Sequence, residues 1–192
     1  FEDANIENAV RGAVSGIFAA TGQTCMAGSR LLVHESIHDE FVEKLLALAK
    51  TAKMGNPLDS ETTVGPVTTR PQYEKVLSYI DVAKSEGAQC VLGGGPATRP
   101  ECGDGWFVEP TIFTGVHNKM RIAQEEVFGP VLSIIKFKTD EEAIQIANDS
   151  PYALAAAVWT AGLDATRLAR RLDHGLVAVN TYPVSMPQSP WG

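Results

Sequence analysis

One cysteine of this chain stands in a sequence frame that suits a nucleophile. Cys25 lies within residues 18–30, FAATGQTCMAGSR, with Gly22 on one side and Gly28 on the other. Glycine has no Cβ, so both positions leave room for a substrate to approach the sulfur. A thiol held between a helix and a strand, near backbone N–H groups, is set up for nucleophilic catalysis. A lone cysteine is otherwise more typical of a buried, inert thiol, and here the glycine frame favours the reactive interpretation.

A second segment carries two adjacent acids. Residues 124–131 read QEEVFGPV, in which Glu125 and Glu126 precede Phe128 and a Gly-Pro pair. A carboxylate can accept hydrogen bonds from two hydroxyl groups, such as those of a ribose. Taken alone, the pair is more typical of a solvated acidic face followed by a phenylalanine that packs in the core.

Together the two segments resemble the active-site cysteine signature and the Glu-x-Phe-Gly-Pro motif of the aldehyde dehydrogenase superfamily. The second motif falls at residues 126–130, and the likeness also covers residues 1–4, 108–111 and 179–180. The cysteine signature matches at Phe18, Gly22, Gln23, Cys25, Ala27 and Ser29. The resemblance implies that residues 1–192 are a single thiol-bearing catalytic domain. It also implies a chain excised from a longer protein, without the N-terminal cofactor-binding domain.

The resemblance implies NAD(P)-dependent oxidation of a small aldehyde to a carboxylic acid. Cys25 would add to the carbonyl, and the thiohemiacetal would lose a hydride to the nicotinamide and leave a thioester for water to hydrolyse. The backbone N–H of Cys25 is an expected donor to the oxyanion. Glu126 is expected to contact the nicotinamide ribose of NAD or NADP, Phe128 to lie against the nicotinamide, and Glu125 to be a surface or structural residue. The family's asparagine oxyanion donor, its glutamate base and its phosphate-binding turn all precede Phe1.

The resemblance places substrate-pocket residues at the end of the chain and beside the nucleophile. Trp191 is the expected apolar wall of the pocket, and Met26 is a second candidate. The alternative for Trp191 is a loose end with nothing to pack against.

Two other functions stay open at this point. In a coenzyme A-acylating relative, the thioester would be released to a thiol and not to water. A non-catalytic fragment or scaffold would keep the fold without the chemistry. Thiol reactivity of Cys25 separates the scaffold from an enzyme.

The pattern of apolar residues predicts an α/β fold around these segments. Helices alternate with strands that are apolar on both faces, which indicates a doubly wound, largely parallel sheet with helices on both faces. Asp3 and Ser36 are predicted N-caps of the first two helices, and Thr139 with Glu142 a capping box. Pro110 limits its strand to an edge or irregular position. The strands are expected at residues 30–34, 89–92, 106–116, 131–137, 154–159 and 175–180.

Composition excludes several classes of function. The net charge is −7 and no block of basic residues is present, which argues against nucleic acid or an anionic membrane as a partner. The four histidines are scattered without ligand spacing, so no metal site is expected. The three cysteines form no disulfide framework, which favours a reducing, cytoplasmic compartment; Cys90 is expected in the core and Cys102 at the surface. The family resemblance adds a homo-oligomer as the expected assembly.

Overall fold

The fold is described from a computed structural model, which covers residues 1–183 and residue 188. Within these residues the helices are α1 (Ile6–Phe18), α2 (His38–Ala49), α3 (Arg70–Ser85), α4 (Arg121–Gln124), α5 (Asp140–Asn148) and α6 (Ala165–Ala169), with 3₁₀ turns η1 (Ala19–Gly22) and η2 (Pro100–Cys102). The strands are β1 (Arg30–His34), β2 (Gln89–Leu92), β3 (Thr111–Thr114), β4 (Val131–Phe137), β5 (Ala155–Val158) and β6 (Leu176–Val179).

The described strands form two sheets. The larger sheet has the order β1-β4-β3-β2, in which β1 and β3 run parallel to β4 and β2 pairs antiparallel with β3. The smaller sheet is the parallel pair β5-β6. The predicted α/β class and the largely parallel pairing are confirmed, and the strands are divided between two sheets.

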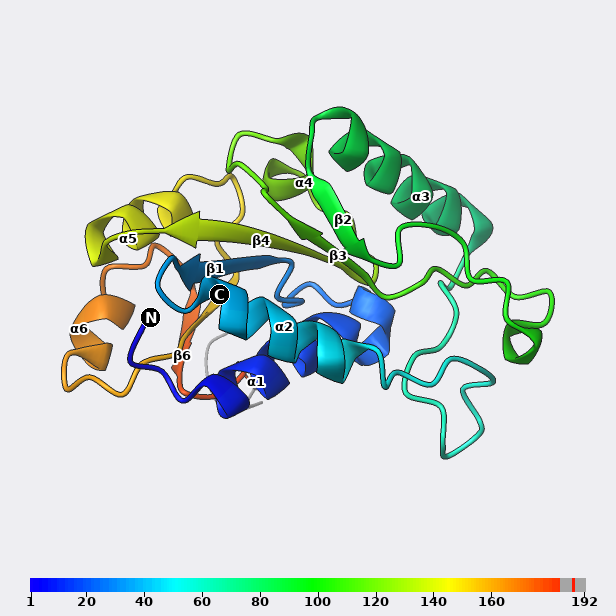
Figure 1. Cartoon of the computed structure of the whole chain (residues 1–192), viewed down its shortest axis with the longest axis horizontal. Helices are drawn as coiled ribbons and strands as arrows, with labels where there is room; N and C mark the ends of the chain where they lie inside the picture. The colour runs from blue at the N-terminus through cyan, green and yellow to red at the C-terminus, as the bar shows by residue number, and fades with distance from the viewer. Residues whose placement is uncertain (184–187, 189–192) are drawn as a thin grey trace.

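Helices cover both faces of the larger sheet, as the apolar pattern predicts. Alternate residues of β4 enter different cores: Leu132 and Ile134 pack with α1 and α2, whereas Val131 and Ile135 pack with α3 and α4. Figure 1 shows α3 and α4 over one face of this sheet and α1 and α2 under the other. Period-two alternation of side chains along a strand makes this arrangement possible, because each face of β4 is apolar.

The smaller sheet has a core of its own. Ile144 of α5, Leu168 of α6 and Val158 of β5 are buried together. In Figure 1, α5, α6 and β6 lie together at the end of the larger sheet that is remote from α3.

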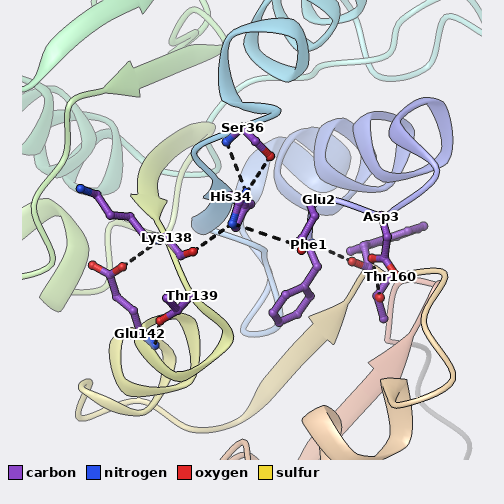
Figure 2. Close-up of polar contacts among 10 residues, drawn as sticks. Phe1, Glu2, Asp3, His34, Ser36, Lys138, Thr139, Glu142 and Thr160 are labelled. Atoms are coloured by element: carbon purple, nitrogen blue, oxygen red, sulfur yellow. Dashed lines mark hydrogen bonds and ion pairs between the residues drawn. The ribbon is translucent and has the colours of Figure 1, made fainter.

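The first residues join the two sheets. The Phe1 backbone nitrogen donates to the Trp159 carbonyl oxygen over 2.8 Å, and the Phe1 ring meets the Phe137 ring edge-on at 5.5 Å. Asp3 accepts a 2.6 Å hydrogen bond from the Thr160 hydroxyl, as Figure 2 shows. The N-terminal residues therefore bridge the ends of β4 and β5.

Two of the predicted caps are wrong. Asn5, and not Asp3, caps α1 by accepting from the Asn8 N–H at 3.0 Å, because Asp3 is held by Thr160. Ser36 lies 2.8 Å from the His34 ring (Figure 2), and the N-cap of α2 is Ile37.

The predicted N-cap of α5, Thr139, is confirmed, whereas the Glu142 side chain bonds the residue before the cap and not the cap itself. The Thr139 hydroxyl accepts from the Glu142 N–H at 3.2 Å, while the Glu142 carboxylate accepts from the Lys138 N–H at 2.7 Å.

Of the two positions predicted for the strand around Pro110, edge or irregular, the edge position is wrong, whereas the pairing of β3 with β2 contains a register shift. β3 lies between β4 and β2. Pro110 immediately precedes the strand, and the first ladder donor is the Thr111 N–H, which reaches the Pro130 carbonyl at 2.9 Å. The missing proline N–H is thus outside the ladder.

Candidate active site

Cys25 lies in a tight loop between α1 and β1. After α1 the backbone passes through three consecutive left-handed residues, Ala20, Thr21 and Gly22, with φ values of 49°, 57° and 67°. The loop then closes with a hydrogen bond from the Gly28 N–H to the Gly16 carbonyl oxygen at 3.0 Å. Cys25 itself is exposed, whereas Cys90 is half-buried and Cys102 is buried. The predicted helix–thiol–strand arrangement is confirmed.

The position predicted for Cys102 is wrong. Its side chain is 5% exposed and packs in the core that includes α1 and α2. Burial raises the pKa of its thiol, so Cys102 is a poor nucleophile.

The cysteine loop touches the second segment directly. A Cβ built on Gly22 would lie 2.0 Å from the Gly129 carbonyl oxygen and 2.9 Å from the Ile17 carbonyl oxygen. No side chain fits there, and φ at Gly22 is in the left-handed region. Gly22 therefore allows two backbones to meet. This reason differs from the one that the sequence suggested, which was space around the sulfur.

The second segment has a left-handed backbone at Phe128. This residue has φ +57°, an uncommon backbone conformation for a side chain of its size. The Gln72 side-chain amide of α3 donates to the carbonyl oxygens of Val127 and Phe128, both at 2.9 Å. Gly129 then lies against Val76, one turn further along α3.

The two adjacent acids have different surroundings. Glu125 receives hydrogen bonds from Arg121 at 2.7 and 3.0 Å and from the Tyr79 hydroxyl at 2.5 Å. Arg121, and secondly Tyr79, hold the pKa of Glu125 at about 2. Glu126 is exposed. The geometry thus gives Glu125 a fixed structural partner, in keeping with its expected structural role, and leaves Glu126 at the surface.

A cavity of about 400 Å³ joins these residues. Its wall includes Cys25, Met26, Glu126 and Phe128, so the structure brings together every predicted site residue that it describes. Trp191 lies outside the described residues. From the thiol the cavity continues between β1 and β5, a strand of the smaller sheet. β1 is an edge strand, because within the described chain only β4 pairs with it.

Tyr182 lines the same cavity and contacts the loop that carries Cys25. Its ring lies against Gly16, where a Cβ would approach to 2.4 Å. Its hydroxyl contacts the carbonyl oxygens of Met26 and Gly16. Burial raises the pKa of this phenol. Sequence reasoning did not single out Tyr182; its place two residues after the final apolar strand was the available signal.

Arg30 anchors the other end of the cysteine loop. Its guanidinium donates to the Asn118 side chain at 2.8 Å and to the carbonyl oxygens of Ile146 and Ala147 at 3.0 and 2.9 Å. The Asn118 carbonyl oxygen accepts from the Gln124 side chain at 2.7 Å. A single half-buried cation thus links the start of β1, the end of α5 and the loop before α4. An arginine at the start of an apolar strand was the sequence signal for this network.

The described part of the chain contains neither a helix that could cross a membrane nor a group of three or more side chains that could hold a metal ion.

Comparisons with known proteins give a consistent result. The profile of the "Aldehyde dehydrogenase family" matches residues 1–192. The chain is 46% identical over 193 residues to betaine aldehyde dehydrogenase of Mesorhizobium japonicum, covering 100% of the chain and 40% of that protein. It is 48% identical over 191 residues to human mitochondrial aldehyde dehydrogenase, covering 99% of the chain and 36% of that protein.

Solved structures agree in fold. Betaine aldehyde dehydrogenase of Staphylococcus aureus in complex with NAD+ has a TM-score of 0.98 and 46% identity, with 100% of this chain and 38% of that chain covered. A point mutant of the same enzyme, also with a TM-score of 0.98 and 46% identity, contains NAD+ and a BME-modified cysteine; the match covers 100% of this chain and 39% of that one. The present chain thus spans about two fifths of the length of these relatives. It belongs to the aldehyde dehydrogenase family.

Proposed function

We propose that this chain forms the thiol-bearing part of an NAD-dependent aldehyde dehydrogenase that converts an aldehyde to a carboxylic acid. The observation that carries the proposal is the contact between Gly22 and the Gly129 carbonyl oxygen. This contact places the exposed thiol of Cys25 and the exposed carboxylate of Glu126 on the wall of one cavity. A nucleophile and a ribose-binding group must share a cavity if a hydride is to leave the substrate for a nicotinamide.

The chain's own residues suit the carbon–sulfur chemistry. The Cys25 thiolate attacks the carbonyl carbon, a C–S bond forms and the carbonyl electron pair moves to oxygen, where the Cys25 N–H is the expected donor. Loss of a hydride from this carbon gives a thioester. Water then attacks the thioester, the C–S bond breaks, and the products are the acid and the free thiol.

Glu126 and Phe128 fit the nicotinamide end of the cofactor. Glu126 is an exposed carboxylate that can accept from both ribose hydroxyls, and Phe128 offers an aromatic face from a rigid turn. NAD, when bound, accepts the hydride. NAD is chosen over NADP because solved relatives of high similarity contain NAD+. Met26 lines the cavity beside the thiol and is proposed as an apolar contact for the substrate.

Selective labelling tests the proposal on the 192-residue chain. Limiting iodoacetamide, followed by digestion and mass spectrometry, should modify Cys25 before Cys90 and Cys102, because only Cys25 is exposed. Equal labelling of Cys102 in the folded chain would contradict the described site.

Turnover requires a full-length protein that carries this chain. There, Cys25→Ala should abolish NAD reduction by aldehydes, and retained oxidation would refute the role of the thiol. Coenzyme A added to the assay distinguishes the products: acid identifies hydrolysis, and an acyl thioester identifies the acylating alternative. The 192-residue chain alone is expected to fold at least partly without oxidising aldehydes, and turnover above its own Cys25→Ala control would show otherwise.

The assembly and the compartment of the full-length protein are further proposals. We infer a homo-oligomer from the family resemblance. We infer a cytoplasmic location from the cysteine pattern. Relatives include proteins named as mitochondrial and chloroplastic, so the family occupies more than one compartment. Light scattering of the purified protein and cell fractionation measure the two properties.

A further inference from the structure

The segment that runs into α3 contacts both loops of the candidate site. The Thr21 hydroxyl donates to the Gly65 carbonyl oxygen at 3.1 Å, and the Gln23 side-chain oxygen accepts from the Thr68 N–H at 3.0 Å. These two contacts hold the turn that precedes Cys25. The Gln72 amide, four residues after Thr68, holds the other loop.

Gln72 matches its two partners in number and direction. A primary amide nitrogen carries two N–H donors, and here each has a carbonyl oxygen at 2.9 Å, those of Val127 and Phe128. Successive carbonyl groups point to the same side of the chain only in particular backbone conformations. The residue between these two carbonyl groups, Phe128, has a left-handed φ of +57°, and a strained backbone of this kind persists only where its surroundings fix it.

The helix that carries Gln72 has a capped N-terminus. Thr69 is the N-cap of α3 and accepts from the Gln72 N–H, and Pro71 occupies the first turn. Proline there has its backbone already set for a helix, because its φ is fixed. Val76, on the same face, is fully buried against Gly129. The side chain of Gln72 therefore reaches the loop from a rigid support.

We infer that Gln72 is a positioning residue for the cofactor side of the site. Its two N–H donors hold the Val127 and Phe128 carbonyl oxygens and thereby fix where Phe128 and the neighbouring Glu126 stand relative to Cys25. The catalytic part of this inference rests on the proposed function. The structural part does not, because the two hydrogen bonds hold the loop with or without a cofactor.

The structural part is tested on the 192-residue chain by hydrogen exchange. Gln72→Leu removes both donors, and Gln72→Glu keeps the size but offers a carboxylate to two carbonyl oxygens at neutral pH. Both variants should speed exchange in residues 127–131 by about tenfold, the effect of losing a net hydrogen bond. Gln145→Leu, the same substitution at an exposed position of α5, is the matched control and should leave this segment unchanged.

The catalytic part is tested in a full-length protein by steady-state kinetics. Gln72→Leu and Gln72→Glu should raise KM for NAD by about tenfold, with a smaller change in kcat and an unchanged rate of Cys25 alkylation. A residue that only filled space would tolerate the isosteric glutamate. A normal KM for NAD in Gln72→Glu would therefore overturn the inference.

The outcomes separate this inference from the proposed function. Unchanged exchange in both Gln72 variants refutes the positioning role even if the protein oxidises aldehydes. Global unfolding of both variants, measured by circular dichroism, refutes a local role as well. Aldehyde oxidation retained in Cys25→Ala refutes the proposed function and leaves the exchange result standing.

Discussion

The contact between Gly22 and Gly129 can be tested by adding one methyl group. Gly22→Ala places a Cβ 2.0 Å from the Gly129 carbonyl oxygen, 2.4 Å from its carbon and 2.9 Å from the Ile17 carbonyl oxygen. All three atoms are backbone, so no change of rotamer relieves the clash. The two loops, or the end of α1, must separate.

The expected loss of stability has two parts. A left-handed backbone costs an L-residue about 1–2 kcal/mol relative to glycine. Overpacking of a fixed site costs a further ~1–3 kcal/mol. The sum, about 2–5 kcal/mol, is a large share of the roughly 5–15 kcal/mol that stabilises a typical domain.

Substitutions at two other glycines allow the backbone strain and the overpacking to be measured separately. Gly87 has φ +94° with nothing within 4 Å of a built Cβ, so Gly87→Ala carries backbone strain alone. Gly95 also has open space and is not left-handed, so Gly95→Ala carries neither cost. Urea unfolding of the four proteins, followed by circular dichroism, should rank their free energies of unfolding as wild type and Gly95→Ala, then Gly87→Ala, then Gly22→Ala. If Gly22→Ala is no less stable than Gly87→Ala, the two loops are not in backbone contact and the reasoning fails.

Three further predictions follow from the site and its supports. In a full-length protein, Glu126→Gln should raise the barrier to hydride transfer by roughly 1.5–3 kcal/mol, the contribution of a charge-assisted hydrogen bond, while Glu125→Gln leaves the rate nearly unchanged. Pre-steady-state absorbance of NADH compares the two variants. Equal effects would contradict the proposal that Glu126, and not Glu125, contacts the ribose. Glu125 has a pKa of about 2, below its ordinary value near 4.3, so its ion pair stabilises the fold above about pH 4.3 and the contribution is lost as the pH falls toward 2. The gap in urea midpoint between wild type and Glu125→Gln should therefore narrow over that range, and a constant gap would show that the Arg121 pair contributes nothing. Asn5→Ala should destabilise the chain by about 1 kcal/mol through loss of the α1 cap, measured by the same unfolding curves, and no loss would mean that the cap is redundant.

Local sequence pattern was sufficient to predict most elements of the fold. β4 is predictable because its residues are apolar on both faces and a Gly-Pro pair precedes it. Thr139 is predictable as a cap because its partner, the Glu142 N–H, lies three residues away in sequence. Contacts of this local kind depend on the spacing of residues along the chain, which can be read directly from the sequence.

Long-range contacts explain where prediction failed. Asp3 has the side chain of an N-cap, but Thr160, 157 residues away, takes its carboxylate. Cys102 stands in a turn-rich segment that looks exposed, yet the fold buries its thiol. Gln72 looks like a surface residue near a helix start, and its partners are 55 and 56 residues away. Nothing in the local spacing distinguishes these residues from their solvated counterparts.

Gly22 shows that sequence reasoning can single out a residue for an incomplete reason. A glycine near a nucleophile suggests room for substrate, and the structure gives instead a backbone contact with Gly129. The two reasons have different consequences. If Gly22 only made room for substrate, a substitution there would affect ligand binding alone. Because Gly22 is in backbone contact with Gly129, a substitution also affects the loop that contains Phe128, which Gln72 connects to α3. The cysteine loop and the Glu-x-Phe-Gly-Pro loop are therefore one structural unit, and we expect a change on either side to alter the distance from the Cys25 thiol to Glu126 and Phe128.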